Sequence, residues 1–375
     1  MICVSRYREA MTDKTDATAS DPTAAGRTAG GPAATDRVLV GVDDSEHCAR
    51  AFDIALTLAQ RRGWSLHLVA TYEIPHHDYG ASEEAVERFR EAVSNEAQKP
   101  LDDFVAQAEA AGVTVTTDLQ EGNAAQLLIR ESETAGLAVV GKRGRNRFAG
   151  RFLGSVSGAL ASHSLCPTLV IPAKWDADDV EVLFAPRQDL PGGEAAATEP
   201  AELVSASDAE VSDEEKKRRR SFDNVADVLN FDGDVVAAVD LGNSSPVVVA
   251  QAAEYAELTG RSLTLVSAVP ITVGTRFPYP GQGAMEVRSM HEYRAEHLSW
   301  MTDTVREKHP ELDVQWRLFD GSPAGVLSEA TRTAALVVLG TRGHGGFSGL
   351  LLGSVSQSVL SRTVAPVLIV PTKDA

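Results

Sequence analysis

Apolar and polar positions alternate along the chain in blocks that are typical of a parallel sheet covered by helices. Two short runs, residues 38–43 and 66–70, are apolar almost throughout, which predicts strands that are buried on both faces. Between these runs, apolar residues recur at helical spacing from Ser45, a candidate cap, to Gly63, a candidate break. Because strand and helix continue to alternate, the pattern predicts an α/β fold with helices on both faces of a parallel sheet.

The rest of the first half continues in the same order. A long charged helix is expected over residues 82–111, with a kink at Pro100, because proline removes a helical hydrogen bond. Alternation over residues 113–119 predicts a strand, and residues 123–134 predict an amphipathic helix. The remaining expected elements are strands at residues 137–141 and 168–172 and, between them, a helix that ends near Ser164.

The second half of the chain repeats these elements. The matching segments are residues 38–43 with 235–240, 66–70 with 263–267, and 168–172 with 367–371. Self-similarity at a nearly fixed interval indicates a tandem duplication. We therefore expect one domain near residues 36–173 and a second domain near residues 232–375.

The segments outside the repeats have a composition that is typical of flexible chain. Residues 1–35 are rich in Thr, Ala, Asp and Gly, and we expect a disordered tail. Residues 174–231 are expected to form an acidic flexible linker, since residues 175–215 hold thirteen Asp or Glu residues against one Arg. The basic run 216–220 is interpreted as part of a solvated helix, with contact to nucleic acid or anionic lipid as the alternative. Apolar positions in residues 221–231 predict a short helix that docks on a domain.

The charge balance narrows the class of partner. A formal net charge of −18 at pH 7 argues against a nucleic-acid surface, which needs clustered Lys and Arg. Lysine is scarce beside arginine, and this acidic, lysine-poor composition predicts a halophilic protein that folds best in high salt. No apolar run approaches the length of a bilayer span, and the N-terminus lacks the apolar stretch of a secretory signal. We therefore expect a cytoplasmic protein without membrane insertion.

A glycine pattern occurs twice, at positions that differ by 199, and it carries the candidate chemistry. The two copies are Gly141, Gly144, Gly154 and Ser155, and Gly340, Gly343, Gly353 and Ser354. Each copy joins a predicted strand to a predicted helix. Such a loop lets backbone N–H groups approach a phosphate, and the helix N-terminus adds partial positive charge. The alternative is a glycine loop that only turns the chain at the sheet edge.

Side chains near the two loops fit the same ligand. The candidate hydroxyl donors to phosphate oxygens are Ser155 and Ser157, with Ser354 and Ser356 in the second half. Asp43 and Asp240 end the first strand of each half, and ligands of open α/β sheets bind at the carboxyl ends of strands. Their carboxylates are expected either to accept from ribose hydroxyls or to coordinate a metal such as Mg²⁺ beside the phosphates.

No residue set in the sequence predicts a catalytic site. The Walker phosphate loop, the dinucleotide fingerprint at the first turn and the nucleophile elbow are all missing from the sequence. His344 lies inside the second glycine pattern and is a candidate phosphate contact. The spacing of Cys3, Cys48 and Cys166 fits no zinc or redox motif, so isolated thiols are expected.

Gly-x-x-Gly, nine residues and then Gly-Ser, after a first strand that ends in Asp, resembles the nucleotide-binding branch of the universal stress protein family. Residues 340–357 are especially similar to the family's motif. The resemblance implies two tandem, open, parallel five-stranded sheets of a Rossmann-like, adenine nucleotide alpha hydrolase-like α/β fold. It also implies a stress-response regulator that binds ATP, ADP or AMP at two sites. The last strands, residues 168–171 and 367–370, are implied to pair, either within the chain as a pseudo-dimer or between chains as a homodimer.

The resemblance also implies which positions contact the nucleotide. The adenine contacts fall on Gly41, Ala70, Ala238 and Ser267. The phosphate and ribose contacts of the first half fall on Asp43, Gly141, Lys142, Arg143, Gly144, Arg145, Asn146, Arg147, Gly154, Ser155, Val156 and Ser157. Those of the second half fall on Asp240, Gly340, Thr341, Arg342, Gly343, His344, Gly345, Gly346, Gly353, Ser354, Val355 and Ser356.

The first loop departs from the small residues that are usual in the family. It carries a basic set made of Lys142, Arg143, Arg145, Arg147 and Arg151. These side chains are expected either to clamp additional phosphate charge or to face solvent and the acidic linker. Two other functions stay open: a slow ATPase or nucleotidyl-transferring enzyme that uses the same loop, and a nucleotide-free adaptor for a transporter or kinase.

Overall fold

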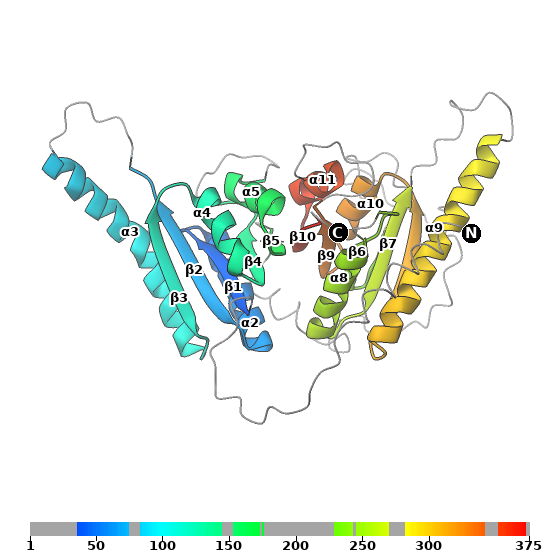
Figure 1. The fold of residues 1–375 in the computed structure, drawn as a ribbon, viewed down its shortest axis with the longest axis horizontal. Helices are drawn as coiled ribbons and strands as arrows, with labels where there is room; N and C mark the ends of the chain where they lie inside the picture. The colour runs from blue at the N-terminus through cyan, green and yellow to red at the C-terminus, as the bar shows by residue number, and fades with distance from the viewer. Residues whose placement is uncertain are drawn as a thin grey trace, which may run out of the picture. The chain divides into compact units, whose positions relative to one another are not determined.

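The computed structural model describes residues 36–74, 83–144, 153–172, 175, 229–242, 245–269, 282–341 and 352–372. The expected tail, most of the expected linker and the middle of both glycine loops lie outside these residues. The described residues form an α/β structure whose two halves have the same order of elements (Figure 1).

Each half contains five strands and four α-helices in the described residues. The elements of the first half are β1 (Arg37–Val42), α2 (Glu46–Arg62), β2 (Ser65–Tyr72), α3 (Glu83–Ala110), β3 (Val115–Glu121), α4 (Ala124–Glu131), the 3-10 turn η1 (Ser132–Thr134), β4 (Leu137–Gly141), α5 (Ser155–His163) and β5 (Thr168–Ile171). Those of the second half are β6 (Val235–Ala238), α8 (Ser245–Thr259), β7 (Leu263–Val269), α9 (Gln282–Lys308), β8 (Val314–Asp320), α10 (Pro323–Ala330), β9 (Leu336–Gly340), α11 (Ser354–Arg362) and β10 (Val367–Val370).

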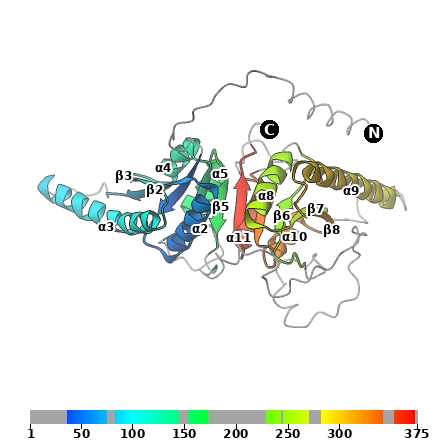
Figure 2. The same ribbon diagram turned by 90° about the horizontal axis from the view of Figure 1, so that it is seen from below.

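The ten described strands form one sheet, in the order β3-β2-β1-β4-β5-β10-β9-β6-β7-β8. Within each half the five strands pair in parallel, which confirms the predicted fold class. Strands β5 and β10 pair antiparallel, with Leu169 opposite Leu368, and so join the halves. Figures 1 and 2 show these two strands side by side. The last strands therefore pair within one chain.

Helices cover both faces of the sheet. Helices α2, α3, α8 and α9 pack on one face, and α4, α5, α10 and α11 pack on the other. Successive strand residues alternate between the two cores, so that Val38 and Val40 face the first group of helices and Leu39 faces the second. The apolar runs in the sequence reflect this burial on both faces.

Local sequence signals set the helix ends. The Ser45 hydroxyl accepts a hydrogen bond from the Cys48 N–H at 3.2 Å and caps α2, and Gly63 ends this helix with a φ of 65°. Helix α3 continues without a break through Pro100, where a kink was expected. Among the described helices, none combines the length and the apolar character that crossing a membrane requires.

Strand β3 begins at Val115, later in the sequence than its apolar alternation predicts. The N–H of Val113 bonds to the Ala108 carbonyl at 2.9 Å, and Gly112 takes a φ of 74°. This 6→1 hydrogen bond across a left-handed glycine is the usual way to close an α-helix. Val113 therefore belongs to the end of α3, although it is buried like a strand residue.

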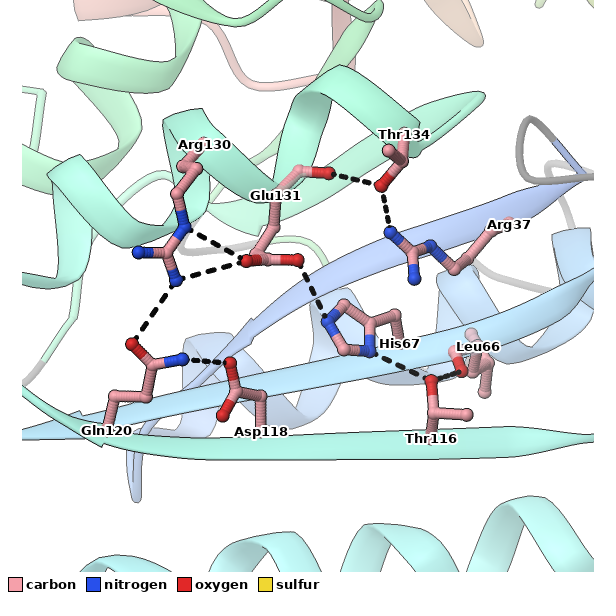
Figure 3. A network of polar contacts seen from close by, with 9 residues as sticks. All are labelled: Arg37, Leu66, His67, Thr116, Asp118, Gln120, Arg130, Glu131 and Thr134. Carbon is pink, nitrogen blue, oxygen red and sulfur yellow. Dashed lines mark hydrogen bonds and ion pairs between the residues drawn. The ribbon is translucent and has the colours of Figure 1, made fainter.

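A polar seam holds α4 against the outer strands of the first half (Figure 3). It consists of His67, Thr116, Gln120, Arg130 and Glu131. The His67 Nδ1 lies 2.8 Å from the Thr116 hydroxyl, and its Nε2 lies 3.5 Å from the Glu131 carboxylate. Arg130 donates to Glu131 and to the Gln120 side chain, both at 3.2 Å. The buried imidazole is thus hydrogen-bonded to β3 through Nδ1, while its Nε2 lies near the Glu131 carboxylate of α4 without a hydrogen bond among the described residues.

The described end of the linker segment packs into the second half. Leu229 and Phe231 are both buried there. The Phe231 ring meets Phe319 edge-on, with centroids 6.2 Å apart, and the Arg317 guanidinium lies over both rings. The expected helix over residues 221–231 lies mostly outside the described residues.

Candidate functional site

The candidate site of the first half lies where β1 and β4 end and α2 and α5 begin. Asp43 follows β1, and its Oδ1 accepts hydrogen bonds from the Ser45 N–H, at 3.0 Å, and from the Ser45 hydroxyl. Its Oδ2 faces the first glycine loop, residues 141–154, because a Cβ built on Gly144 would lie 2.5 Å from that oxygen. Glycine at this position lets the loop backbone approach the carboxylate.

Helix α2 passes close to the start of the same loop. A Cβ built on Gly141 would lie 2.9 Å from the His47 carbonyl oxygen and 3.0 Å from the His47 Cβ. The pKa of His47 is lowered, first by burial and then by the positive charges of Arg50 and Arg143. Gly141 is therefore required by packing, whether or not a ligand is bound.

The backbone of Lys142 fastens the two ends of the loop together. Its N–H donates to the Ile171 carbonyl at 2.7 Å, and its carbonyl accepts from the Gly154 N–H at 3.0 Å. The Ser157 hydroxyl also donates to the Lys142 carbonyl at 3.0 Å and is buried. Ser157 was expected to donate to phosphate, and in this structure its proton is used to hold the loop instead.

The Lys142 side chain points away from the candidate site. Its Nζ donates to the Ser361 carbonyl at 2.9 Å and to the Thr363 carbonyl at 3.4 Å, at the end of α11 in the second half. Burial lowers the pKa of Lys142 to about 8. In this structure the ammonium is held by helix-terminal carbonyls with partial negative charge, so its expected contact with phosphate stays a prediction.

The second glycine loop, residues 340–353, is fastened in the same way. The Thr341 N–H donates to the Val370 carbonyl at 2.9 Å, and the Gly353 N–H donates to the Thr341 carbonyl at 2.7 Å. The Thr341 hydroxyl bonds to the Thr372 hydroxyl at 2.8 Å. The Ser356 hydroxyl donates to the Gly340 carbonyl at 2.7 Å. Thr341 and Ser356, which were expected to bind phosphate, have their hydroxyls engaged within the protein.

Backbone donors remain at the start of the two following helices. Gly154 and Gly353 are the N-cap residues of α5 and α11. The first-turn N–H groups have no acceptor within their helix, and those of Ser155, Val156, Ser354 and Val355 have none among the described residues. They can meet an anion at the positive end of the helix.

A pocket lies beside Asp43, between the ends of β1 and β2 and helix α3. It is lined by Val42, Asp43, Asp44, Ala70, Thr71, Glu96, Ala97 and Pro100. Ala70, an expected adenine contact, is part of this lining. Sequence reasoning missed Ala97 and Pro100, because small residues on a long helix carry no signal of a site.

Gly41, the other expected adenine contact of the first half, leaves no room for a side chain toward α4. A Cβ built there would lie 2.7 Å from Leu128 Cδ1 of α4, whereas Ala70 packs on the side of α2 and α3. The Gly41 carbonyl accepts a hydrogen bond from the Cys48 Sγ at 3.5 Å. The structure therefore brings Ala70 and Asp43 to the pocket, whereas the described contacts of Gly41 are with α2 and α4, and its role as an adenine contact stays a prediction.

The second half has a different set of side chains at the matching edge. Asp240 Oδ1 accepts from the Gly242 N–H at 2.8 Å and from the Ser245 hydroxyl at 2.9 Å. Ser267 is buried, and its hydroxyl accepts from Arg294 Nη1 at 3.1 Å. Burial lowers the pKa of Arg294, and the charge of Asp240 acts in the opposite direction. Arg294 was missed in the sequence because its contact with the strand edge is made only in the folded chain.

The other expected site residues divide into described and undescribed positions. Ala238 ends β6 and is partly exposed. The expected contacts that lie outside the described residues are Arg145, Asn146, Arg147, Arg342, Gly343, His344, Gly345 and Gly346. Among the described residues, no three His, Cys, Asp or Glu side chains gather as a metal site would require. Cys48 and Cys166 are free and buried, and burial raises their pKa values to about 12 and about 11.

Comparisons with known proteins agree with the fold described above. The family model "Universal stress protein family" matches residues 34–172 and 233–371. A universal stress protein of Mycolicibacterium smegmatis is 29% identical over 345 residues, which cover 89% of this chain and 96% of the relative. One from Mycobacterium tuberculosis is 24% identical over 347 residues, with 88% and 94% covered. The crystal structure of a universal stress protein from Archaeoglobus fulgidus has a TM-score of 0.55 at 18% identity, and covers 90% of this chain and 98% of its own.

Proposed function

We propose that this chain, which belongs to the universal stress protein family, is a cytoplasmic stress-response regulator that binds an adenine nucleotide. The observation that carries the proposal is the meeting of three features at one sheet edge of the first half. They are the Asp43 carboxylate, the backbone at Gly144 and the pocket that Ala70 helps to line. A ligand with a base, a ribose and a phosphate chain matches this order of features.

Each part of the nucleotide has a candidate partner. The base would lie at the small pocket between β2 and α3, and the Asp43 carboxylate would accept from the ribose hydroxyls. Phosphates would meet the N–H groups at the start of α5, together with the guanidinium of Arg143 in the loop. Mg²⁺ beside the phosphates is the alternative role for Asp43. Because the side chains of Lys142 and Ser157 bond elsewhere, we expect phosphate binding to depend mainly on backbone donors.

The mechanism that we propose is regulation through the loop. Both ends of the first loop are already fixed at Lys142 and Gly154. A bound phosphate chain would add contacts between these fixed ends and would favour one loop conformation over others. A ligand shifts such an equilibrium by the difference in its affinity for the two states. A partner would then bind the loop surface in that conformation.

Thermal melting of the full chain with ATP, ADP or AMP tests the proposal. A nucleotide at about a hundred times its Kd should stabilise the fold by about 2.7 kcal/mol. Asp43→Asn keeps an oxygen for Ser45 but removes the charge, so we expect about a tenfold weaker Kd by calorimetry. Asp53→Asn, at a half-buried position of α2 outside the pocket lining, is the matched control and should leave the Kd unchanged.

The alternatives predict other results. No melting shift with any of the three nucleotides at millimolar concentration would favour a nucleotide-free adaptor for a transporter or kinase. Multiple-turnover consumption of ATP would favour a slow ATPase or a nucleotidyl-transferring enzyme. Binding without turnover, weakened by Asp43→Asn, supports the regulatory proposal.

A further inference from the structure

The two halves can be compared position by position at the candidate edge. From the first strand to the long helix of each half, a residue of the first half corresponds to the residue 197 positions later in the second half. The corresponding pairs are Asp43 and Asp240, Ala70 and Ser267, Leu101 and Leu298, and Phe104 and Met301. Both members of the last two pairs are buried and hold α3 and α9 on the same face of the sheet. By this register, Ala97 corresponds to Arg294 and Pro100 corresponds to His297.

In the first half, small side chains leave room at this edge. Ala70 on β2 and Ala97 on α3 line the pocket beside Asp43. Neither methyl group extends far from its backbone, and neither can donate a hydrogen bond. A small pocket therefore remains between strand and helix, beside a carboxylate that has one oxygen turned toward the loop.

In the second half, a large cation takes the corresponding space. Arg294 reaches from α9 to the end of β7, where its Nη1 donates to the Ser267 hydroxyl at 3.1 Å. Its Nε is buried. The negative charge of Asp240 acts on Arg294 and on His297, whose ring lies 5.9 Å from that of Trp300. Three positions that are apolar or prolyl in the first half thus carry polar side chains in the second, and two of them, Ser267 and Arg294, are hydrogen-bonded to each other.

We propose that the two candidate sites have diverged, so that the chain binds one adenine nucleotide, in its first half, and Arg294 excludes the base from the second. This inference rests on the proposed function. A base that entered the second site would have to displace Arg294 from Ser267 and separate it from Asp240. A half-buried guanidinium that loses its partners is costly, because its charge is already poorly solvated.

The arrangement makes Arg294 the residue that decides nucleotide stoichiometry. Arg294→Ala introduces the residue type of the first half and would leave only small side chains on β7 and α9 at the edge beside Asp240. The reciprocal change, Ala97→Arg, would place a guanidinium beside Ala70 and Asp43. Arg294→Ala therefore opens the space beside Asp240, and Ala97→Arg fills the corresponding space beside Asp43.

Isothermal titration calorimetry of the full chain with ATP measures the stoichiometry directly. We expect one nucleotide per chain for the wild type, two for Arg294→Ala with Kd values within tenfold of each other, and none for Ala97→Arg. Arg306→Ala, on the same helix but away from the edge, is the control and should keep one. Circular dichroism and melting curves confirm that each variant is folded. If Arg294→Ala does not fold, Arg294→Met keeps the apolar stem and replaces it.

Each contrary outcome has a separate meaning. Two nucleotides per wild-type chain would overturn the inference and leave the proposed function intact. One nucleotide on a folded Arg294→Ala chain would show that Arg294 does not exclude the base. Weaker binding in Arg294→Ala would identify Arg294 as a ligand contact and overturn the inference as well. No nucleotide on the wild type would remove the proposed function, and the inference with it.

Discussion

At the scale of single residues, the glycines of the first loop have two separate roles. Gly144 brings the backbone to the Asp43 carboxylate, and Gly141 makes room for the passage of α2 at His47. A glycine pattern in a sequence does not distinguish a position kept for a ligand from one kept for packing, because both need the missing Cβ. In the structure an added Cβ would meet the backbone of α2 at Gly141, and the end of a side chain, the Asp43 carboxylate, at Gly144.

Gly141→Ala should destabilise the protein even without nucleotide. The added methyl group would lie 2.9 Å from the His47 carbonyl oxygen, and a backbone atom cannot move aside cheaply. We expect a loss of about 1–3 kcal/mol in the free energy of unfolding, measured by urea titration. Gly158→Ala in α5 is the control, since its Cβ would meet only the Leu153 side chain at 3.4 Å. Equal stability of the two variants would contradict this account.

The contacts of the Lys142 side chain were not predictable from the sequence for a similar reason. In the sequence it stands between glycines, beside Arg143, as a phosphate-binding lysine would. In the structure it serves the carbonyls of Ser361 and Thr363, which lie more than two hundred positions away in the chain. Such a partner cannot be read from local spacing, because only the pairing of the two halves brings it near.

Lys142→Met should weaken the fold without touching the candidate site. The substitution keeps an apolar stem but leaves two carbonyls at the end of α11 without their donor. We expect a loss of about 1–3 kcal/mol in the free energy of unfolding, followed by chemical denaturation. Lys99→Met, at an exposed ion pair with Glu96, is the matched control and should change stability little. A negligible effect of Lys142→Met would show that water replaces the ammonium.

At the scale of elements, the strands were predictable and the ends of helices were less so. The parallel strands follow from apolar runs, because burial on both faces excludes polar residues. Val113 was assigned to a strand because it is apolar, whereas its N–H closes α3. The polar seam also gave no sequence signal, since His67 lies within an otherwise apolar strand and its partners come from β3 and α4.

The polar seam predicts a pH dependence of stability. The pKa of His67 is lowered, first by burial and then by Arg37, while Glu131 and Asp118 act in the opposite direction. Because the folded state resists protonation of His67, the unfolded state binds the proton first as the pH falls. The stability is therefore complete above the unfolded pKa, about 6.5, and is lost as the pH falls below it.

His67→Gln should remove part of this dependence. Urea unfolding at pH 7.5 and pH 5.5 measures it as the difference in the free energy of unfolding between the two pH values. We expect a smaller difference in the variant than in the wild type, because glutamine does not titrate. His163→Gln, at the end of α5, is the control and should keep the wild-type difference. An unchanged difference in His67→Gln would show that burial of this imidazole does not limit acid stability.

At the scale of the whole molecule, the net charge of −18 sets an expectation for salt. Like charges repel across a compact surface, and dissolved ions screen this repulsion. We expect the melting temperature to rise between 0.1 M and 2 M KCl. Sucrose at matched osmolarity is the control, because it adds no ions. A melting temperature that is the same in both salt concentrations would remove the halophilic interpretation.

The antiparallel contact between β5 and β10 has a consequence for assembly. A strand edge with unpaired N–H and C=O groups is a template for another strand, and here each half closes that edge of the other. The two halves of one chain thus make a strand pairing that two separate molecules could otherwise make. If the two halves were separate chains, each would expose the unpaired edge of its last strand. We expect each half to pair with another copy through that edge. A single chain therefore contains the arrangement of a dimer.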